Sequence, residues 1–235
     1  MPVYQLTNEL NFPPPQMAEP SGLLAIGGDL STERLLQAYA RGIFPWYSAG
    51  DPLLWWSPDP RTIIIPDEFH CSRRLRRLIR QQVYTIRADT AFAEVVEACA
   101  GIPRAHEQGT WITPEMQSAY CRLHKAGFAH SIEAWQREEL VGGLYGVSLG
   151  RGFFGESMFS HTSNASKTAL AALVETLASW HYLFIDCQFT TAHLSTLGAR
   201  EIPRQRYLAL LHEAFRHPTG PGLWTASFPT AGEIP

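Results

Sequence analysis

The segment that decides the fold is AHSIEAWQREELVGGLYGVSLGRGFFGESMFS, which spans residues 129–160. Its first part, Ala129 to Trp135, alternates as a strand does when one face is buried. A turn is expected at residues 136–138, a second strand at about 139–147 and a third at 152–159. These three strands form the centre of the predicted sheet.

The residues that follow complete the pattern of a layered fold. A helix capped by Asn164 or Ser163 runs to about Trp180, and residues 183–188 form a short apolar strand. Two more helices are expected, at about 190–197 and after Pro203. The order strand, strand, strand, helix, strand, helix predicts a mixed sheet with helices on its faces, an α/β (α+β) class.

The part of the chain before residue 129 is richer in loops. Ser31 caps a helix that ends at Gly42. Residues 44–61 are expected to be an ordered loop, because their prolines remove backbone donors. Strands are expected at 62–65 and 83–87, and helices at 72–81, 90–100 and 114–126. We therefore expect a small N-terminal α+β domain over residues 1–62 and a larger domain over residues 63–235, with 110 as the latest position of the boundary.

The composition is that of a globular protein. Of the 235 residues, 45% are hydrophobic and 17% are charged, which excludes disordered and fibrous classes. No stretch of about 18 residues is apolar throughout, and the first 20 residues lack the pattern of a secretory signal, so we expect no membrane contact and a cytoplasmic location. The cysteines form no CxxC pair and the histidines no HExxH pair, so neither disulfides nor a metal are expected.

A basic segment contrasts with the net charge of −3. Residues 61–87 hold seven arginines and two acids, and residues 72–82 hold five arginines and no acid. At 3.6 residues per turn, one side of the predicted helix carries Arg73, Arg76, Arg77 and Arg80. A solvated helix face usually mixes both signs, so contact with nucleic-acid phosphates is the better explanation.

Two motifs match catalytic signatures but lack the required context. Residues 146–150 read GVSLG, the GxSxG pattern of serine hydrolases, yet a strand follows where that motif needs a helix. Residues 150–155 read GRGFFG, the GxGxxG pattern of dinucleotide-binding proteins, and they also lead into a strand. We interpret both as glycines that permit tight turns and close backbone approach.

Polar side chains inside apolar strands mark a candidate site. On an alternating strand Glu156 shares a face with Met158, and Asp186 shares one with Gln188. A carboxylate in an apolar run needs a partner or a chemical task, and a structural hydrogen-bond network explains it as well as catalysis does. Core packing and base stacking likewise both fit the tryptophans Trp46, Trp55, Trp56 and Trp111.

Eight blocks, taken together and in order, resemble the bacterial leucyl/phenylalanyl-tRNA–protein transferases. They are GGDL at 27–30, RGIFPW at 41–46, WWSPDPR at 55–61, GTWIT at 109–113, LVGGLYGV at 140–147, GESMFS at 155–160, NASKTAL at 164–170 and IDCQ at 185–188. The resemblance implies a catalytic domain similar to the Gcn5-related N-acetyltransferase fold. It also implies transfer of Leu or Phe, and Met less well, from aminoacyl-tRNA to the α-amine of proteins that begin with Arg or Lys, which marks them for N-end-rule degradation.

The resemblance implies a role for individual residues. Trp46 and Trp111 match positions around the terminal adenosine of the tRNA. The apolar pocket for the transferred side chain matches Leu144, Phe153, Met158 and Ile185, and the catalytic centre matches Asp186, Gln188 and Glu156. We expect Asp186 to orient the Gln188 amide and to help remove charge from the attacking ammonium. The arginine stripe would hold the tRNA backbone, and we expect a monomer that uses no cofactor.

The sequence is also compatible with three other functions. One is an N-acetyltransferase that uses acyl-CoA, although residues 163–167, SNASK, lack the glycine pair with which such enzymes hold pyrophosphate. Another is a tRNA- or peptide-binding module without activity. The third is a serine hydrolase with Ser148 as nucleophile.

Overall fold

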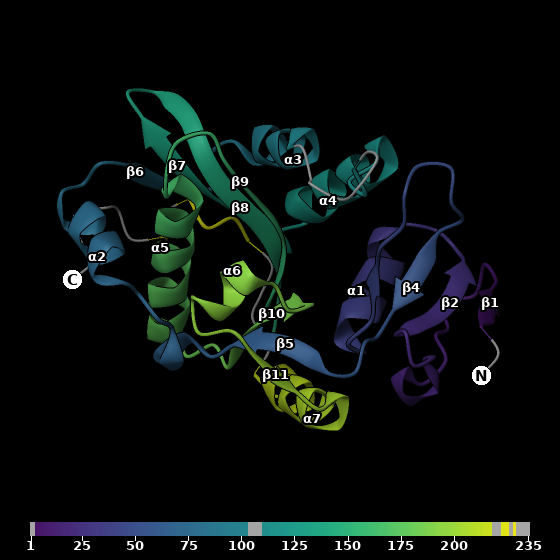
Figure 1. The fold of residues 1–235 in the computed structure, drawn as a ribbon. Helices are drawn as coiled ribbons and strands as arrows, with labels where there is room; N and C mark the ends of the chain where they lie inside the picture. The colour runs from purple at the N-terminus through teal and green to yellow at the C-terminus, as the bar shows by residue number, and fades with distance from the viewer. Residues whose placement is uncertain (1–2, 103–109, 218–221, 226–227, 229–235) are drawn as a thin grey trace.

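The computed structural model describes residues 3–102, 110–217, 222–225 and 228, and it contains two sheets (Figure 1). The smaller sheet has the order β1-β2-β4-β3 and consists of β1 (Tyr4–Leu6), β2 (Leu23–Gly27), β3 (Phe44–Pro45) and β4 (Leu54–Trp56). The prediction of a loop over residues 44–61 is therefore wrong in part. Pro45 is tolerated because β3 is an edge strand, where one backbone donor is not needed.

The larger sheet has seven strands in the order β11-β5-β10-β9-β8-β7-β6. Neighbouring strands of this sheet pair antiparallel, except that β9 and β10 pair parallel with each other. The strands are β5 (Arg61–Ile64), β6 (Thr85–Ala88), β7 (Ala129–Gln136), β8 (Glu139–Leu149), β9 (Gly152–Ser160), β10 (Phe184–Gln188) and β11 (Arg200–Ile202). The predicted mixed sheet is confirmed, and its centre is the segment 129–160.

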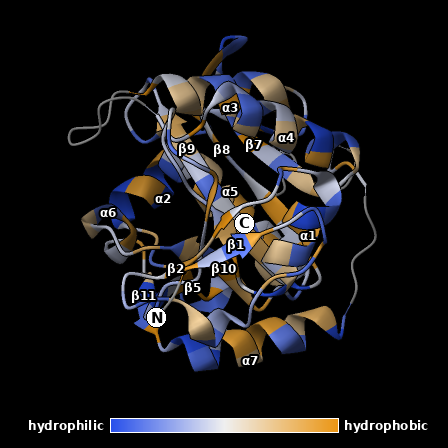
Figure 2. Ribbon diagram, turned by 90° about the vertical axis from the view of Figure 1, so that its right-hand side faces the viewer, coloured by the Kyte–Doolittle hydropathy of each residue, from blue (hydrophilic) through white to orange (hydrophobic). Residues whose placement is uncertain are grey.

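Helices cover both faces of this sheet (Figure 1). Helix α5 packs on β7 and β8 from one side, and α3 and α4 lie on the other. In Figure 2, α7 shows the alternating bands of an amphipathic helix. The helices are α1 (Thr32–Ala40), α2 (Arg73–Arg80), α3 (Phe92–Gly101), α4 (Pro114–Lys125), α5 (Ala165–Ser179), α6 (Ala192–Ser195) and α7 (Arg204–Phe215), with 3-10 turns at Pro15–Met17 and Pro66–Glu68.

Two clusters of buried side chains fill the two sides of the larger sheet. One contains Tyr120 and Phe154 and continues through Trp55 into the smaller sheet. The other lies against α5 and contains Phe153 and Leu173. The predicted domain boundary at residue 62 falls close to the point where one sheet ends and the other begins. It stays a prediction, since the first cluster joins the two sheets.

Helix caps follow the sequence at α1 and differ from it at α5. Ser31 accepts a hydrogen bond from the backbone N–H three residues later, as predicted. Asn164 occupies the predicted N-cap position of α5, but its backbone is left-handed (φ 67°) and its side chain makes no capping hydrogen bond. Instead Ser160, at the end of β9, accepts a hydrogen bond from the Ser166 backbone N–H. The tight turn from β9 into α5 thus brings the strand end to the helix start.

Candidate active site

The candidate site lies where the two parallel strands separate. Pairing between β9 and β10 ends with Phe154 opposite Asp186. Glu156 and Gln188 each follow two residues later. The two polar side chains therefore stand at the mouth of a gap between neighbouring strands.

Both strands contain a bulge at this gap. On β9 the register against β8 shifts, so that Gly155 and Ser157 have partners while Glu156 between them has none. On β10 the register against β5 shifts before Gln188, whose backbone is left-handed (φ 57°). Bulges redirect side chains and are frequent next to active sites. The alternation predicted for Glu156 and for Gln188 therefore does not hold across the gap.

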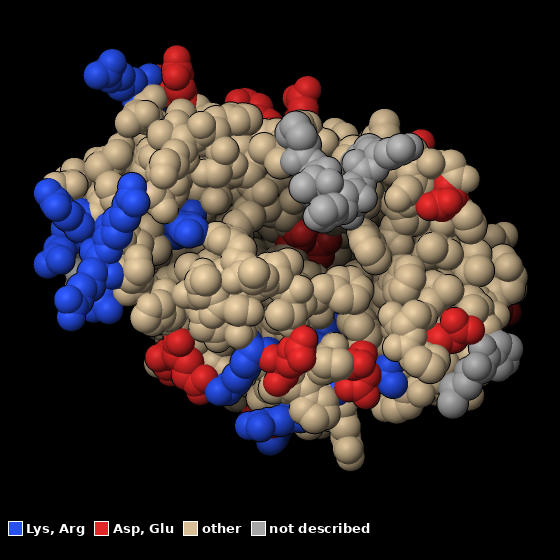
Figure 3. All heavy atoms as spheres, viewed as in Figure 1, with Lys and Arg blue, Asp and Glu red and all other residues tan. Residues whose placement is uncertain are grey.

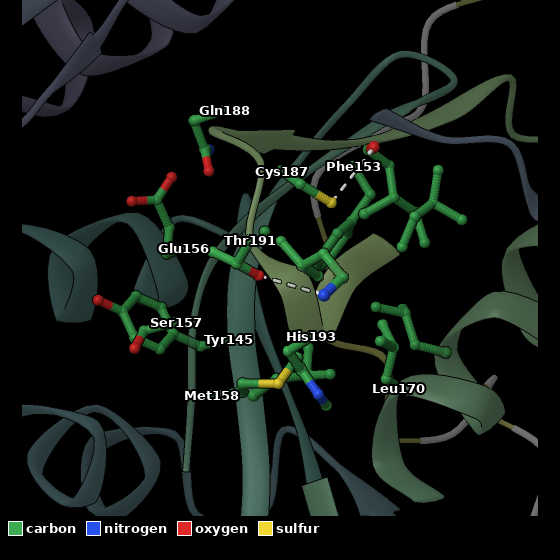
Figure 4. Close-up of a pocket in the computed structure, with 16 residues that line it drawn as sticks. Tyr145, Phe153, Glu156, Ser157, Met158, Leu170, Cys187, Gln188, Thr191 and His193 are labelled. Carbon is green, nitrogen blue, oxygen red and sulfur yellow. Dashed lines mark hydrogen bonds between the residues drawn. The ribbon is translucent and has the colours of Figure 1, made fainter. Parts of the chain in front are cut away.

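An apolar pocket of about 240 Å³ opens at the gap (Figure 4). All four residues predicted for an apolar pocket line it, namely Leu144, Phe153, Met158 and Ile185. Leu170 and Leu173 close it from α5. Figure 4 shows Glu156 and Gln188 together at one end, away from Leu170. The pocket therefore combines an apolar interior with one polar end.

Two tyrosines from distant parts of the chain hold Glu156. Its Oε1 accepts a hydrogen bond from Tyr39 Oη and its Oε2 accepts one from Tyr120 Oη, both at 2.7 Å. The two hydroxyl oxygens are 2.6 Å apart. Each of these three oxygen–oxygen contacts needs one proton between its two atoms, and the two tyrosine hydroxyls supply two. All three contacts are therefore hydrogen bonds only when Glu156 is protonated and supplies the third.

The surroundings of Glu156 also move its pKa. Burial raises the pKa of Glu156 to about 7, although the hydrogen bonds from Tyr120 and Tyr39 act to lower it. Burial likewise raises the pKa of both tyrosines, so they remain hydrogen-bond donors. Glu156 is therefore a group that exchanges a proton near neutral pH at the end of a pocket.

Asp186 has a different environment, because a cation neutralises it. Its Oδ1 accepts a hydrogen bond from Arg61 Nε (2.8 Å), and its Oδ2 accepts from Arg61 Nη2 (2.6 Å) and Tyr207 Oη (2.8 Å). The Arg61 guanidinium lies 4.8 Å from the Phe44 ring centroid and 4.5 Å from that of Tyr207. Burial acts to lower the pKa of Arg61, but Asp186, Tyr207 and Glu156 together raise it above its usual range, so the guanidinium stays charged beside Asp186.

The contact between Asp186 and Gln188 differs from the expected one. Asp186 Oδ1 accepts a hydrogen bond from the backbone N–H of Gln188 (2.9 Å), not from its side-chain amide. Asp186 is fully buried and does not line the apolar pocket, whereas Gln188 does. The carboxylate thus fixes the turn that presents the Gln188 side chain.

A second, aromatic pocket of about 270 Å³ adjoins the first. Its aromatic walls come from Phe44, Trp46, Trp111 and Phe189, which belong to three separate parts of the chain. Glu156 and Gln188 line this pocket as well as the apolar one. The two pockets therefore meet at the same pair of polar side chains.

The four candidate tryptophans divide into two groups. Trp46 and Trp111 line the aromatic pocket together, although 65 positions separate them. Trp55 is fully buried and its Nε1 donates to the Gly27 carbonyl. Trp56 supports Trp46, since its Nε1 donates to the Trp46 carbonyl at 2.7 Å. Two of the four thus face a cavity, Trp56 supports one of them, and Trp55 belongs to the core.

The arginine stripe lies outside both pockets. Arg73, Arg76, Arg77 and Arg80 are exposed on α2. Figure 3 shows basic side chains gathered over α2 at the left, with a hollow at the centre that has acidic atoms at its floor. Helix α2 packs on α5, which also closes the apolar pocket. The stripe therefore lies on a helix next to the one that closes the apolar pocket.

The two glycine motifs have structural roles. Ser148 is buried within β8, and its Oγ lies 2.7 Å from Tyr182 Oη. It does not stand at the start of a helix, so the serine-hydrolase alternative is wrong. Residues 150–155 form the turn from β8 and the first half of β9, as interpreted from the sequence.

Some residues of the site carry little signal in the sequence. Arg61 stands 125 positions from Asp186 and Tyr39 stands 117 positions from Glu156, so no local pattern links them. The one clue to Arg61 in the sequence is that a buried carboxylate such as Asp186 needs a cation as partner. His193 was also missed; it lines the apolar pocket, and burial and Lys167 lower its pKa.

Comparison with known proteins gives a consistent result. The family model described as leucyl/phenylalanyl-tRNA protein transferase matches residues 63–212, and the model of its N-terminal domain matches residues 28–59. A protein of Desulfatibacillum aliphaticivorans named leucyl/phenylalanyl-tRNA–protein transferase is 59% identical, over 96% of this chain and 97% of its own. A protein of the same name from Syntrophus aciditrophicus is 51% identical, over 100% of this chain and 98% of its own.

Two further findings complete the comparison. A solved structure of L-PGS from Bacillus licheniformis is similar with a TM-score of 0.38 and 12% identity, over 73% of this chain and 56% of that one, which is too low to support an argument. Within the described residues, none of the helices has both the length and the apolar character that spanning a bilayer requires.

Proposed function

Since the chain belongs to the leucyl/phenylalanyl-tRNA–protein transferase family and transfers aminoacyl groups from tRNA to protein N-termini, we propose that its two pockets hold the two ends of one substrate. The apolar pocket takes the Leu or Phe side chain, and the aromatic pocket takes the terminal adenosine. The observation that carries this proposal is that Glu156 and Gln188 line both pockets. The ester that joins the two ends would then lie beside them.

The reaction requires a proton acceptor. The amine nitrogen attacks the ester carbonyl carbon, a C–N bond forms, and the bond from that carbon to the ribose oxygen breaks. The nitrogen loses a proton and the ribose oxygen gains one. Glu156 is the group we assign to accept the first proton and to supply the second, because its pKa of about 7 suits both steps.

Asp186 and Gln188 have positioning and binding roles in this proposal. A Gln amide is too weak a base to take a proton, but it can hydrogen-bond the ester or the amine. The Arg61–Asp186 pair holds the backbone turn that directs this amide into the gap. Positioning of two reactants is a large part of catalysis when the donor is already activated.

Selection of the aminoacyl group and of the acceptor follows from the same side chains. The apolar pocket favours Leu and Phe over smaller groups, but one methylene is worth only about 1–3 kcal/mol, so Met is also accepted, less well. An acceptor that begins with Arg or Lys is favoured by the Glu156 carboxylate. Asp186 adds little to this preference, because Arg61 neutralises it.

The remaining expectations concern the tRNA and the setting. We assign the stripe Arg73, Arg76, Arg77 and Arg80 to the tRNA backbone. We also propose that the enzyme is monomeric, uses no cofactor and acts in the cytoplasm.

The triple variant Arg76→Glu, Arg77→Glu, Arg80→Glu tests the role of the stripe. It should raise the KM for aminoacyl-tRNA roughly tenfold and reduce the dependence of this KM on salt, because each lost phosphate contact removes one released counterion. The exposed Arg206→Glu is the matched control; an unchanged salt dependence would remove the stripe from the tRNA site.

A transfer assay tests the proposed function directly. Labelled Leu-tRNA and a peptide that begins with Arg should yield a peptide extended by Leu at its N-terminus. An N-acetylated copy of the peptide should yield none. Binding of tRNA and peptide without product would instead support the non-catalytic alternative, and acetylation from acetyl-CoA would support the acyl-CoA alternative.

A further inference from the structure

Phe189 is an exposed aromatic side chain at the edge of the aromatic pocket. It is 37% exposed, among the few large apolar side chains of the described residues that reach this value. It lines the aromatic pocket but not the apolar one. Part of the Phe189 ring is therefore not covered by other side chains and is accessible to a ligand.

The position of the ring is nevertheless well defined. Its centroid lies 5.4 Å from the Trp46 ring at an interplanar angle of 51° and 5.8 Å from the Phe44 ring at 82°. Its backbone N–H donates to the Cys187 carbonyl (2.6 Å), and the preceding residue is held by Asp186. Phe189 is thus a fixed ring with one part packed and another part in water, as a stacking platform requires.

The direction of the bound tRNA end can be derived from the two pockets. The ester on the terminal ribose must lie at the side shared by both pockets, next to Glu156 and Gln188. The preceding nucleotide must then leave from a part of the aromatic pocket that is not shared. Phe189 belongs to that part, as do Phe44, Trp46 and Trp111.

We propose that Phe189 stacks on the base of the nucleotide that precedes the terminal adenosine, and so forms a second nucleobase subsite. This inference rests on the proposed function. The surroundings favour a base over the acceptor peptide, because among the described residues Glu156 is the only acidic one that lines the aromatic pocket, and it lies at the shared side. A cationic peptide would seek carboxylates, whereas a base needs an accessible aromatic face.

Three donors of increasing length separate this subsite from the first one. They are aminoacyl-adenosine, the aminoacyl dinucleotide cytidylyl-adenosine, and aminoacyl-tRNA. Phe189→Ala should raise the KM of the dinucleotide and of the tRNA roughly 5- to 100-fold, the range expected for loss of one stacked base. The KM of aminoacyl-adenosine should stay within about twofold.

Two conservative variants identify the property of the ring that matters. Phe189→Tyr should restore the KM of the dinucleotide, since it keeps the aromatic face. Phe189→Leu should not, since it keeps the apolar bulk without that face. Equal behaviour of the Leu and Tyr variants would overturn the stacking proposal.

Other outcomes would also overturn the inference. An equal rise of KM for all three donors would show that Phe189 only supports Trp46. A rise confined to the KM of the acceptor peptide would show that Phe189 contacts the peptide. Transfer by the unaltered protein from aminoacyl-tRNA tests the proposed function separately. Its absence would overturn that function, whereas its presence with equal Phe189→Ala effects on all three donors would overturn this inference alone.

Discussion

Asp186 and Glu156 are carboxylates on neighbouring strands, and their surroundings differ in one decisive respect. Both accept hydrogen bonds from tyrosine hydroxyls, Asp186 from Tyr207 and Glu156 from Tyr39 and Tyr120. Asp186 also has a guanidinium on both of its oxygens. Glu156 forms no salt bridge with any residue that the structure describes. The charge of Asp186 is offset by a fixed cation, whereas Glu156 exchanges a proton near neutral pH.

The difference shows how one fold assigns two tasks to the same chemical group. Burial disfavours the charged form of any carboxyl group, and a paired cation offsets that cost. The Arg61–Asp186 salt bridge therefore shapes the backbone at Gln188. Glu156, without such a cation, retains the capacity to change its protonation state near neutral pH.

Removal of the Asp186 carboxylate should have the largest effect, a loss of folding stability. Asp186→Ala leaves the Arg61 guanidinium buried without its counter-ion, which costs about 3–5 kcal/mol of the free energy of unfolding. Urea unfolding measures this loss, and the exposed Asp67→Ala should stay within about 0.5 kcal/mol. Replacement of both partners by Arg61→Met and Asp186→Leu should recover part of the loss. A loss below about 1 kcal/mol for Asp186→Ala would contradict the ionic role of the pair.

Substitution of Glu156 should lower the rate of transfer. Glu156→Gln resembles the protonated acid and keeps partners for Tyr39 and Tyr120, but it cannot accept a proton from the amine. We expect kcat to fall about 100-fold, within the range of general acid–base catalysis. The rise of kcat through pH 7 in the unaltered protein should disappear, while the exposed Glu139→Gln keeps it. A Glu156→Gln variant that retains the rise would assign the proton transfer to another group.

The same substitution should also have a pH-dependent effect on stability. The pKa of Glu156 is raised from 4.5 to about 7 in the folded protein, so its protonated form stabilises the fold. This contribution is complete below about pH 4.5 and is lost as the pH rises through 7. Relative to the unaltered protein, Glu156→Gln should therefore gain stability with rising pH, up to about 3 kcal/mol at pH 8. Thermal or urea unfolding at pH 5 and pH 8 measures the difference in stability between the variant and the unaltered protein. A difference that does not change with pH would contradict the raised pKa.

Prediction from the sequence succeeded where the signal is local. The strands of 129–160, the helix capped by Ser31 and the arginine-rich helix α2 all have a periodicity that a few consecutive residues define. The apolar pocket residues came from the family resemblance, and all four line one cavity. Phe153 and Met158 are five positions apart, so strict alternation would have placed them on opposite faces. The bulge at Glu156 is what returns them to the same side.

The sequence by itself determined the class of fold, the family and the position of most elements, because hydrophobic periodicity and short motifs belong to neighbouring residues. Only the tertiary structure decided which carboxylate pairs with a cation and which one has a raised pKa. That outcome depends on Arg61 reaching Asp186 across 125 positions and on Tyr39 reaching Glu156 across 117. It also depends on two bulges, which exist only once strands pair. A pKa reports the whole surroundings of a group, and those surroundings come together only when the chain has folded.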